Sequence, residues 1–429
     1  MNLPSLRRIL LPLALLAFGS LFSAQPAFPE AAATTPVAAK HKHRNHKRAV
    51  ATKTAVVTSP ATGRTVAHTT THAAVIHTGV STTIAANPTR RRRTRRAVWS
   101  PWTEPTYADS TVGDSVDGED LIVRKAAVDA LGPYNGTVVV ADPQSGRILS
   151  MVNQKLATKG AFQPCSTVKM VVSVASLSEG IVNPEAQVHL TRRFSMDMTQ
   201  ALARSNNLYF AKLGEQLGFE RVEKYGKLMG LGEKAGLDIP GEEAGYLASE
   251  PPTTGVGMMT SFGDGIRITP LELTSIVSTI ATGGTMYYLQ YPKTQDEVQK
   301  LIPRIKRELD IANFIPEIKN GMEGAVEYGT ARRAIFDPAE PVFGKTGTCT
   351  DTAQPGVHLG WFGSFNEVGN KKLAVVVLLT GGRGISGPVA SGVAGGVYRN
   401  LEAQHYFGGP EQQTSIPTAL VSLPGLAAK

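Results

Sequence analysis

The pattern of apolar and polar positions predicts a folded domain that begins near residue 98 and mixes helices with strands. Apolar residues recur at helical spacing in 121–131, which predicts a helix. Two apolar runs, 136–141 and 147–152, predict strands. The five residues between them, Asp142-Pro143-Gln144-Ser145-Gly146, favour a turn, so a hairpin is expected here.

Helical patterns occupy most of the middle of the chain. Residues 166–180 are apolar on nearly all sides, which predicts a buried central helix. A second, interrupted helical region is expected over 198–217. Thr269-Pro270-Leu271-Glu272 has the residues of a helix start, with Thr as the N-cap, Pro at the first position and Glu at the third. Further helices are expected over 295–310 and 315–328.

The C-terminal part of the chain returns to strand patterns. Runs at 342–348, 356–365 and 372–380 predict three strands, and 388–402 predicts a closing helix. Together with the early hairpin this makes five strands. Periodicity alone does not show which of them pair.

The first 28 residues are typical of a targeting segment. Arg7 and Arg8 precede the apolar run Ile9–Phe22, which fits a signal-peptide core and falls short of the about 20 residues that span a bilayer. Export is therefore expected. No clear small-residue cleavage site is present. If the apolar run is extended as far as Phe28, it is long enough to act as an uncleaved anchor. Cleavage and anchoring both stay open for 1–28.

Residues 29–97 have the composition of a disordered linker. Ala, Thr, Val, His and basic residues dominate, and such a segment cannot bury enough apolar area to offset its chain entropy. Residues 1–97 contain 15 Lys or Arg and one acidic residue, whereas the rest of the chain contains 29 basic and 34 acidic residues. The overall net charge of +9 therefore comes from the tail.

Two basic clusters, 40–48 and 90–96, lie within this linker. In a cytosolic protein they would suggest nucleic-acid binding, but the expected export argues against that class of partner. Six of the nine histidines fall in the tail without the spacing of a metal site. A solvated linker is favoured, and contact with an anionic membrane or wall polymer is the alternative.

A candidate nucleophile lies in Pro164-Cys165-Ser166-Thr167-Val168-Lys169. Positions three apart share a helix face, so the Ser166 hydroxyl and the Lys169 amine would lie together. An amine whose pKa is lowered by burial or by other cations can accept the serine proton. The pair alone is weak evidence, because Ser and Lys fall three apart by chance in many chains.

Two downstream stretches make the pattern specific. Ser205-Asn206-Asn207 and Lys345-Thr346-Gly347-Thr348 complete the order Ser-x-x-Lys, Ser-x-Asn, Lys-Thr-Gly-Thr. This series resembles the penicillin-binding proteins and serine β-lactamases, and the similarity covers about residues 120 to 403. Other stretches similar to transpeptidase domains are Ser261–Gly265, Thr269–Leu273, Ala281–Gly284, Gly329–Ala331 and Trp361–Gly363.

The resemblance implies an α/β (α+β) fold, in which helices cover a five-stranded antiparallel sheet and a helical subdomain is inserted after the nucleophile's helix. The expected organisation is a targeting segment (1–28), a disordered linker (29–97), a penicillin-binding transpeptidase domain (98–408) and a C-terminal tail (409–429). The linker lacks the composition of the upstream module of the larger transpeptidases, so a bifunctional role is not expected.

The resemblance also implies catalytic roles. Ser166 would attack the acyl carbon of a D-Ala-D-Ala peptide, and Lys169 would accept its proton. Ser205 would pass a proton toward the leaving amine, while Asn207 would hold Lys169 or the substrate amide. Lys345 would supply positive charge to Ser205 and to the substrate carboxylate.

The third motif would bind the substrate. Thr346, Gly347 and Thr348 are the expected substrate-binding residues, with the two threonine hydroxyls donating to the substrate carboxylate. The N–H groups of Ser166 and Thr348 would form the oxyanion hole. No metal or organic cofactor is required.

Peptidoglycan stem peptides and β-lactams are the partners that the resemblance implies, together with a divisome or elongasome protein. Nucleic acid is not expected as a partner. The expected location is the periplasm or cell envelope, with 1–28 as an inner-membrane anchor where it is not cleaved.

Three functions stay open at this point. A D,D-transpeptidase or D,D-carboxypeptidase with an acyl-enzyme on Ser166 is favoured. A serine β-lactamase is the first alternative, since Phe162 and Pro164 before the motif resemble one β-lactamase class, although that class has Ser-x-Val as its middle motif. A non-catalytic β-lactam or wall-fragment sensor is the second, and the presence of every catalytic position argues against it.

The two cysteines, Cys165 and Cys349, each lie next to a motif residue. Because the resemblance brings Ser166 and Thr348 together at the oxyanion hole, their neighbours should also be close, and export favours oxidation. A disulfide is therefore expected. The alternative is a pair of small residues that fill tight space beside the site.

Overall fold

The computed structural model describes residues 105–408 except 184, 336 and 370. The segments expected to be a targeting sequence, a linker and a tail, 1–28, 29–97 and 409–429, lie outside the described residues. Within the described range, no helix is both long enough and apolar enough to cross a membrane.

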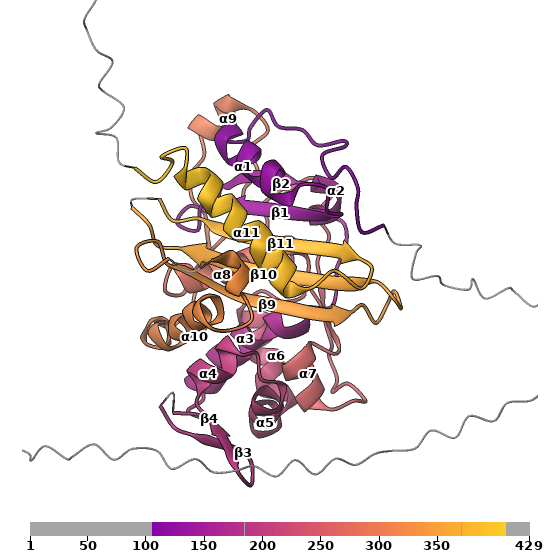
Figure 1. Cartoon of the computed structure of the whole chain (residues 1–429), viewed down its shortest axis with the longest axis vertical. Coiled ribbons are helices and arrows are strands. Elements are labelled where there is room, and N and C mark those ends of the chain that lie inside the picture. Colours follow the sequence, from indigo (N-terminus) through magenta and orange to yellow (C-terminus); the bar gives the residue numbers. More distant parts are fainter. Residues whose placement is uncertain (1–104, 184, 336, 370, 409–429) are drawn as a thin grey trace, which may run out of the picture. The chain divides into compact units, whose positions relative to one another are not determined.

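Five antiparallel strands form the central sheet (Figure 1). From edge to edge their order is β2 (Ile148–Val152), β1 (Gly136–Ala141), β11 (Ala374–Gly381), β10 (His358–Asn366) and β9 (Val342–Thr350). The predicted five-stranded antiparallel sheet is confirmed, and so is the early hairpin, because β1 pairs with β2. The central pairing of β1 with β11 joins the two ends of the domain.

The sheet separates apolar clusters that lie on its two faces. Val138 and Val140 of β1 pack into the core beneath α1 (Leu121–Leu131) and α11 (Gly387–Glu402). Val139 packs into a cluster on the opposite face with Leu271 of α8 (Pro270–Ala281). Successive strand residues point to opposite faces, so a sheet covered on both sides needs apolar residues at nearly every position, as β1 has.

The helical subdomain lies along the β9 edge of the sheet (Figure 1). At its centre, residues 169–177 of α3 are all buried, which agrees with the central helix predicted from the sequence. The elements of this part are the 3-10 helix η1 (Cys165–Val168), α3 (Lys169–Ser178), β3 (Val188–Thr191), β4 (Phe194–Met196), α4 (Met198–Ala203), α5 (Asn207–Leu217), α6 (Phe219–Leu228), β5 (Tyr246–Leu247), α7 (Val256–Phe262) and β6 (Ile266–Arg267).

The remaining elements connect the subdomain to the sheet. They are α2 (Gln154–Thr158), β7 (Thr285–Tyr287), α9 (Gln295–Gln299), β8 (Ile305–Glu308), the 3-10 helices η2 (Ala312–Phe314) and η3 (Arg332–Ala334), and α10 (Ile315–Glu327).

Local signals predicted some helices well and one badly. The capping box at the start of α8 is present, with the Thr269 hydroxyl and the Glu272 carboxylate each accepting from the other's backbone N–H. The predicted helix over 295–310 is wrong, because α9 ends at Gln299 and β8 pairs with β7. Pro303 lacks an N–H and cannot continue a helix, and pairing with a distant strand determines the conformation that follows.

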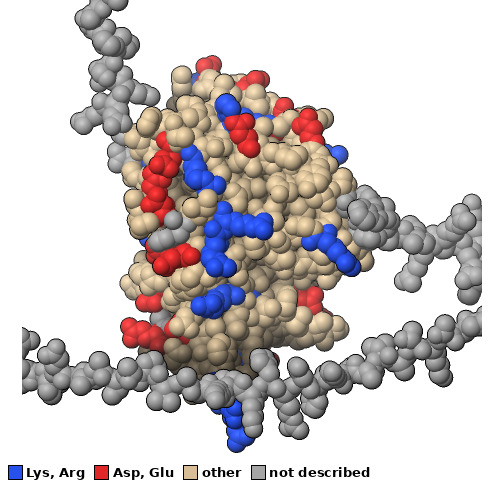
Figure 2. Space-filling view, viewed as in Figure 1, with Lys and Arg blue, Asp and Glu red and all other residues tan. Residues whose placement is uncertain are grey.

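The surface of the described domain carries charges of both signs. On the face in Figure 2, Lys and Arg side chains lie near Asp and Glu side chains, and neither sign covers the surface. This agrees with a sequence in which the excess of basic residues lies before residue 98.

Candidate active site

Ser166 and Lys169 lie at the junction between η1 and α3. Cys165 has a positive φ of 52°, and this turn sets Ser166 on the 3-10 helix rather than in the first turn of an α-helix. Lys169 begins α3, and its Nζ lies 2.9 Å from Ser166 Oγ. The hydroxyl and the amine therefore lie together as predicted. The turn that brings them together is a 3-10 helix, which is tighter than the α-helix that the sequence pattern indicated.

Ser205 and Asn207 approach the same amine from the break between α4 and α5. Ser205 has a φ of 55°, a left-handed conformation that is costly for a residue other than glycine. The Asn206 side chain caps α5 by accepting from the Tyr209 N–H at 2.9 Å. With the backbone turned in this way, Ser205 Oγ and Asn207 Oδ1 lie 3.1 Å and 2.5 Å from Lys169 Nζ.

Lys169 is a buried amine among oxygen atoms. Besides the three side chains, the Ser205 carbonyl oxygen lies 3.0 Å from its Nζ, and the Phe210 ring centroid lies at 5.6 Å. Burial, helped by the nearby charge of Lys345, lowers the pKa of the Lys169 amine from 10.5 to about 6. At neutral pH the amine is therefore mostly uncharged, with a lone pair that can accept a proton from a hydroxyl.

Lys345 of β9 is fully buried. Burial lowers the pKa of its amine from 10.5 to about 7. Its Nζ donates to the Thr346 carbonyl at 3.1 Å, and no hydrogen bond joins it to Ser205 among the residues that the structure describes. Its charge is the second cause, after burial, of the lowered pKa of Lys169.

The third motif approaches the nucleophile's turn closely. A Cβ on Gly347 would lie 2.8 Å from the Pro164 carbonyl oxygen, so this close approach requires glycine. Thr348, on the exposed part of β9, accepts through Oγ1 from the Gly387 N–H at 2.8 Å. The three predicted motifs are thus assembled around one site.

Cys165 and Cys349 form a disulfide, with their Cα atoms 5.6 Å apart. The bond confirms the pairing expected from the sequence. It links the residue before the candidate nucleophile to the residue after Thr348. The start of η1 and the end of β9 are therefore covalently joined beside the site.

A family model for the penicillin-binding protein transpeptidase domain matches residues 136–400, which is more than half of the chain. The chain belongs to this family. The match includes all three motifs and the five strands of the sheet.

Two of the curated relatives that match the chain are a sporulation protein and a peptidoglycan D,D-transpeptidase. The chain is 28% identical over 313 residues to stage V sporulation protein D of Bacillus subtilis, an alignment that covers 63% of this chain and 48% of the relative. It is 23% identical over 357 residues to peptidoglycan D,D-transpeptidase MrdA of Haemophilus influenzae, covering 63% and 54%. The chain spans about half the length of the curated relatives it matches.

Solved structures support the fold. Penicillin-binding protein PBP2 of Pseudomonas aeruginosa superposes with a TM-score of 0.56 at 22% identity, covering 67% of this chain and 77% of that one. PBPA of Mycobacterium tuberculosis gives 0.55 at 21% identity, covering 66% and 81%. Five antiparallel strands with flanking helices are thus shared with penicillin-binding proteins.

Two residues near the third motif were not predicted as site residues. Thr330 Oγ1 lies 2.6 Å from Thr346 Oγ1, and the Thr330 N–H donates to the Ala203 carbonyl at 3.2 Å, next to the second motif. Gly387 contacts Thr348 at the start of α11. The stretch Gly329-Thr330-Ala331 resembles transpeptidase domains, and this resemblance is the sequence feature that could have identified Thr330.

No group of three or more His, Cys, Asp or Glu within the described part of the chain could hold a metal ion. His189 is on the β3–β4 hairpin, where its ring contacts the Ser195 hydroxyl at 2.6 Å. It takes no part in the site.

Proposed function

We propose that this chain is a penicillin-binding serine D,D-transpeptidase or D,D-carboxypeptidase that acts on peptidoglycan stem peptides through an acyl-enzyme on Ser166. The observation that carries the proposal is the position of the Lys169 amine within hydrogen-bond distance of both the Ser166 and Ser205 hydroxyls. One amine can then serve proton transfer in both directions. Relatives of this family are named peptidoglycan D,D-transpeptidases.

Acylation begins with proton transfer from Ser166 to neutral Lys169. Ser166 Oγ then forms a bond to the carbonyl carbon of the penultimate D-Ala. The bond from that carbon to the nitrogen of the terminal D-Ala breaks, and the nitrogen receives a proton by way of Ser205. The short contact between Lys169 and the Asn207 oxygen keeps the amine between the two hydroxyls.

The carboxylate of the terminal D-Ala would lie against the third motif. Its negative charge would raise the pKa of Lys345 again, so that the amine becomes cationic when substrate binds. Thr346 and Thr348 would donate their hydroxyl hydrogens to the carboxylate, while Gly347 allows the strand to pass close to the nucleophile's turn. A buried lysine with a pKa of about 7 is suited to respond to an anion in this way.

The oxyanion would form between the N–H groups of Ser166 and Thr348. Removing one such donor typically reduces transition-state stabilisation by about 2.7–4 kcal/mol. Cys165–Cys349 supports the arrangement, because the bond joins the immediate neighbours of the two donors. A fixed separation is what an oxyanion hole requires.

The contacts of the candidate catalytic residues favour this proposal over a serine β-lactamase. Within the described chain, no Asp or Glu makes a hydrogen bond or ion pair with Ser166, Lys169 or Ser205. These contacts therefore include no carboxylate that could activate a deacylating water, which fits a long-lived acyl-enzyme. The alternative of a non-catalytic sensor is disfavoured by the arrangement of the Ser166, Ser205 and Asn207 side chains around the Lys169 amine, which a binding-only site does not need.

The partners and location extend the proposal. An exported protein of the periplasm or cell envelope would meet peptidoglycan and β-lactams. Anchoring through 1–28, contact of the basic linker 29–97 with an anionic membrane or wall polymer, and a divisome or elongasome partner are parts of the proposal that need cellular tests. The acceptor of the acyl group, an amine or water, separates transpeptidase from carboxypeptidase.

The test is the lifetime of a fluorescent penicillin adduct on the purified chain. We expect covalent labelling that lasts from many minutes to hours, and none with Ser166→Ala. Rapid turnover of penicillin would identify a β-lactamase. Binding without a covalent adduct would identify a sensor.

A further inference from the structure

Besides the disulfide, an arginine side chain forms a second connection between the segment before Ser166 and the end of β9. Arg267 of β6 donates to the Ala161 carbonyl, and its NH1 pairs with Asp351 Oδ1 at 3.2 Å. Ala161 lies five residues before Ser166, and Asp351 lies three residues after Thr348. One side chain therefore joins the segment that leads to the candidate nucleophile with the turn that follows the third motif.

Asp351 is held firmly on its side of this connection. Its side chain is fully buried, and its Oδ1 also accepts from the Ala353 N–H at 3.1 Å. Its own N–H donates to the Val357 carbonyl at 2.8 Å, just before β10 begins. A buried carboxylate needs a partner cation, and Arg267 is the cation paired with it in the described range.

The segment before Ser166 is equally well defined. Phe162 and Ile268 exchange both backbone hydrogen bonds, at 2.9 and 2.8 Å, and Ile268 directly follows Arg267. The Gln163 carbonyl accepts from Trp361 Nε1 of β10 at 2.9 Å. The approach to the nucleophile is thus bound to β6 as well as to the sheet.

We propose that Arg267 is a positioning residue that holds the nucleophile's segment on the end of β9 independently of the Cys165–Cys349 bond. This inference rests on the proposed function, because its effect is on the acylation of Ser166. With both connections present, loss of one leaves the other to maintain the site. Loss of both leaves the segment held by its hydrogen bonds to Ile268 and Trp361, so that its position relative to the end of β9 is less fixed.

The experiment measures how much reduction of the disulfide slows acylation by fluorescent penicillin. The purified full-length chain is compared with Arg267→Lys, each oxidised and reduced, with the thiols counted by mass spectrometry. Lysine keeps the charge but lacks the planar fork that reaches a carbonyl and a carboxylate together. We expect reduction to slow acylation of the wild type by less than about threefold and acylation of Arg267→Lys by about tenfold or more. The effects should not be additive, because both connections act on the same segment.

Arg124→Lys is the matched control. Arg124 also bridges a backbone carbonyl, that of Met151, and a carboxylate, that of Asp114, but near the β2 edge of the sheet. Its substitution should leave the effect of reduction equal to that in wild type. A general loss of stability would instead increase the effect in both variants, and that result would contradict the inference.

Further measurements keep the outcome decisive. Each rate is divided by the active fraction of the protein, which is found by penicillin titration. If Arg267→Lys does not fold, Asp351→Asn is measured in its place. Deuterium exchange of the Phe162 and Ile268 amides should rise only when both connections are lost. If the wild type is not labelled by penicillin, the proposed function fails, and deuterium exchange still tests the inference. If the wild type is labelled but reduction of the disulfide slows acylation equally in wild type and Arg267→Lys, the inference alone is overturned.

Discussion

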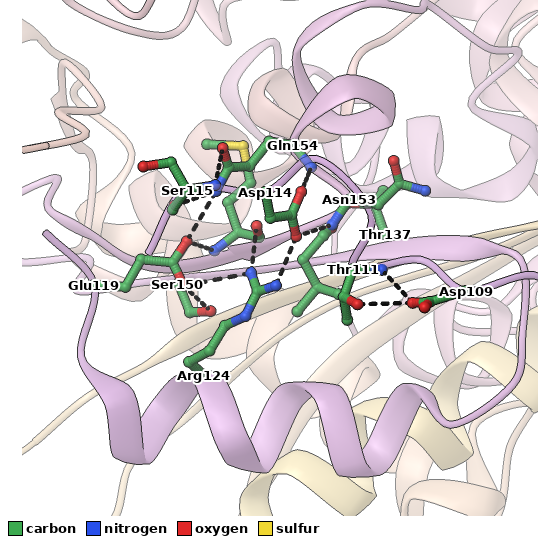
Figure 3. A network of polar contacts seen from close by, with 12 residues as sticks. Asp109, Thr111, Asp114, Ser115, Glu119, Arg124, Thr137, Ser150, Asn153 and Gln154 are labelled. Carbon is green, nitrogen blue, oxygen red and sulfur yellow. Dashed lines mark hydrogen bonds and ion pairs between the residues drawn. The ribbon is translucent and has the colours of Figure 1, made fainter. Parts of the chain in front are cut away.

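Buried basic side chains occur at both edges of the sheet, in opposite surroundings. Near the β2 edge, Arg124 pairs with Asp114 at 2.7 Å and with Glu119 at 3.5 Å (Figure 3). At the β9 edge, Lys169 and Lys345 are buried with hydroxyl, amide and carbonyl oxygens as partners, and no carboxylate pairs with either in the described residues.

The difference separates a structural cation from a reactive one. Carboxylates favour the charged form of a buried base, whereas burial without them favours the neutral form. Lys169 and Lys345 accordingly have pKa values lowered to about 6 and about 7. The Arg124 cluster binds the start of the domain to the sheet and to Tyr291, while Lys169 remains available for proton transfer and Lys345 can respond to a bound anion.

The largest effect should come from Lys169→Met, which removes the proposed base and keeps an unbranched side chain. We expect the rate of acylation by penicillin to fall by roughly 10²–10⁴-fold, the usual contribution of a general base. The melting temperature should stay the same or rise, because folding of the wild type must remove the proton of this amine, whose pKa is lowered to about 6. Labelling at the wild-type rate would show that Lys169 is not the base.

The pH dependence of acylation should show the same lysine. Lys169 must be neutral to accept a proton, so the rate should rise with pH through about 6 and then level off. Below that pH, each unit should lower the rate about tenfold. A profile that is flat from pH 5 to 8, measured with penicillin in excess, would contradict the assigned role.

Stability should follow pH in the same direction. An unfolded lysine has a pKa of about 10.4, so between about 6 and 10 the unfolded chain binds more protons than the folded one. The free energy of unfolding therefore gains a contribution that increases as pH rises through this window. Thermal melts of wild type and Lys169→Met should show a smaller slope in the variant.

Arg124→Met should have the opposite consequence from the same change at Lys169. It leaves Asp114 and Glu119 buried without their cation, and the free energy of unfolding should fall by about 3–5 kcal/mol. Acylation per active site should remain near the wild-type rate, because the cluster is remote from Ser166. A loss of acylation in protein that is still folded would show that the two edges are coupled.

The sequence predicted those features that depend on neighbouring residues. The capping box at Thr269 and the turn after β1 are local signals, and both were found where expected. The helix expected over 295–310 failed because the pairing of β8 with β7 is not local. Arg124 is a similar case, since Glu119 and Tyr291 of its cluster are 172 residues apart.

For the site, the motifs predicted which residues come together and that the pKa of the lysine base is lowered, but not how deeply each lysine is buried. The order of the three motifs identified Ser166, Lys169 and Ser205, and the turn at Ser205 was expected because Ser205 and Asn207 cannot share a helix face. The depth at which Lys345 is buried depends on packing of the whole sheet. Likewise, the contact of Thr330 with Thr346 joins two elements that no spacing rule relates.

The smallest effect should come from a change outside both regions. Deleting 29–97 removes a segment whose composition offers few residues for a core, and we expect the rate of penicillin acylation and the melting temperature of the domain to be unchanged. In cells, the same deletion should alter location or wall association, because the basic clusters 40–48 and 90–96 are lost. A control that replaces only the Arg and Lys of these clusters by Gln separates charge from length. A truncated chain that failed to fold or to acylate would show that the linker packs against the domain.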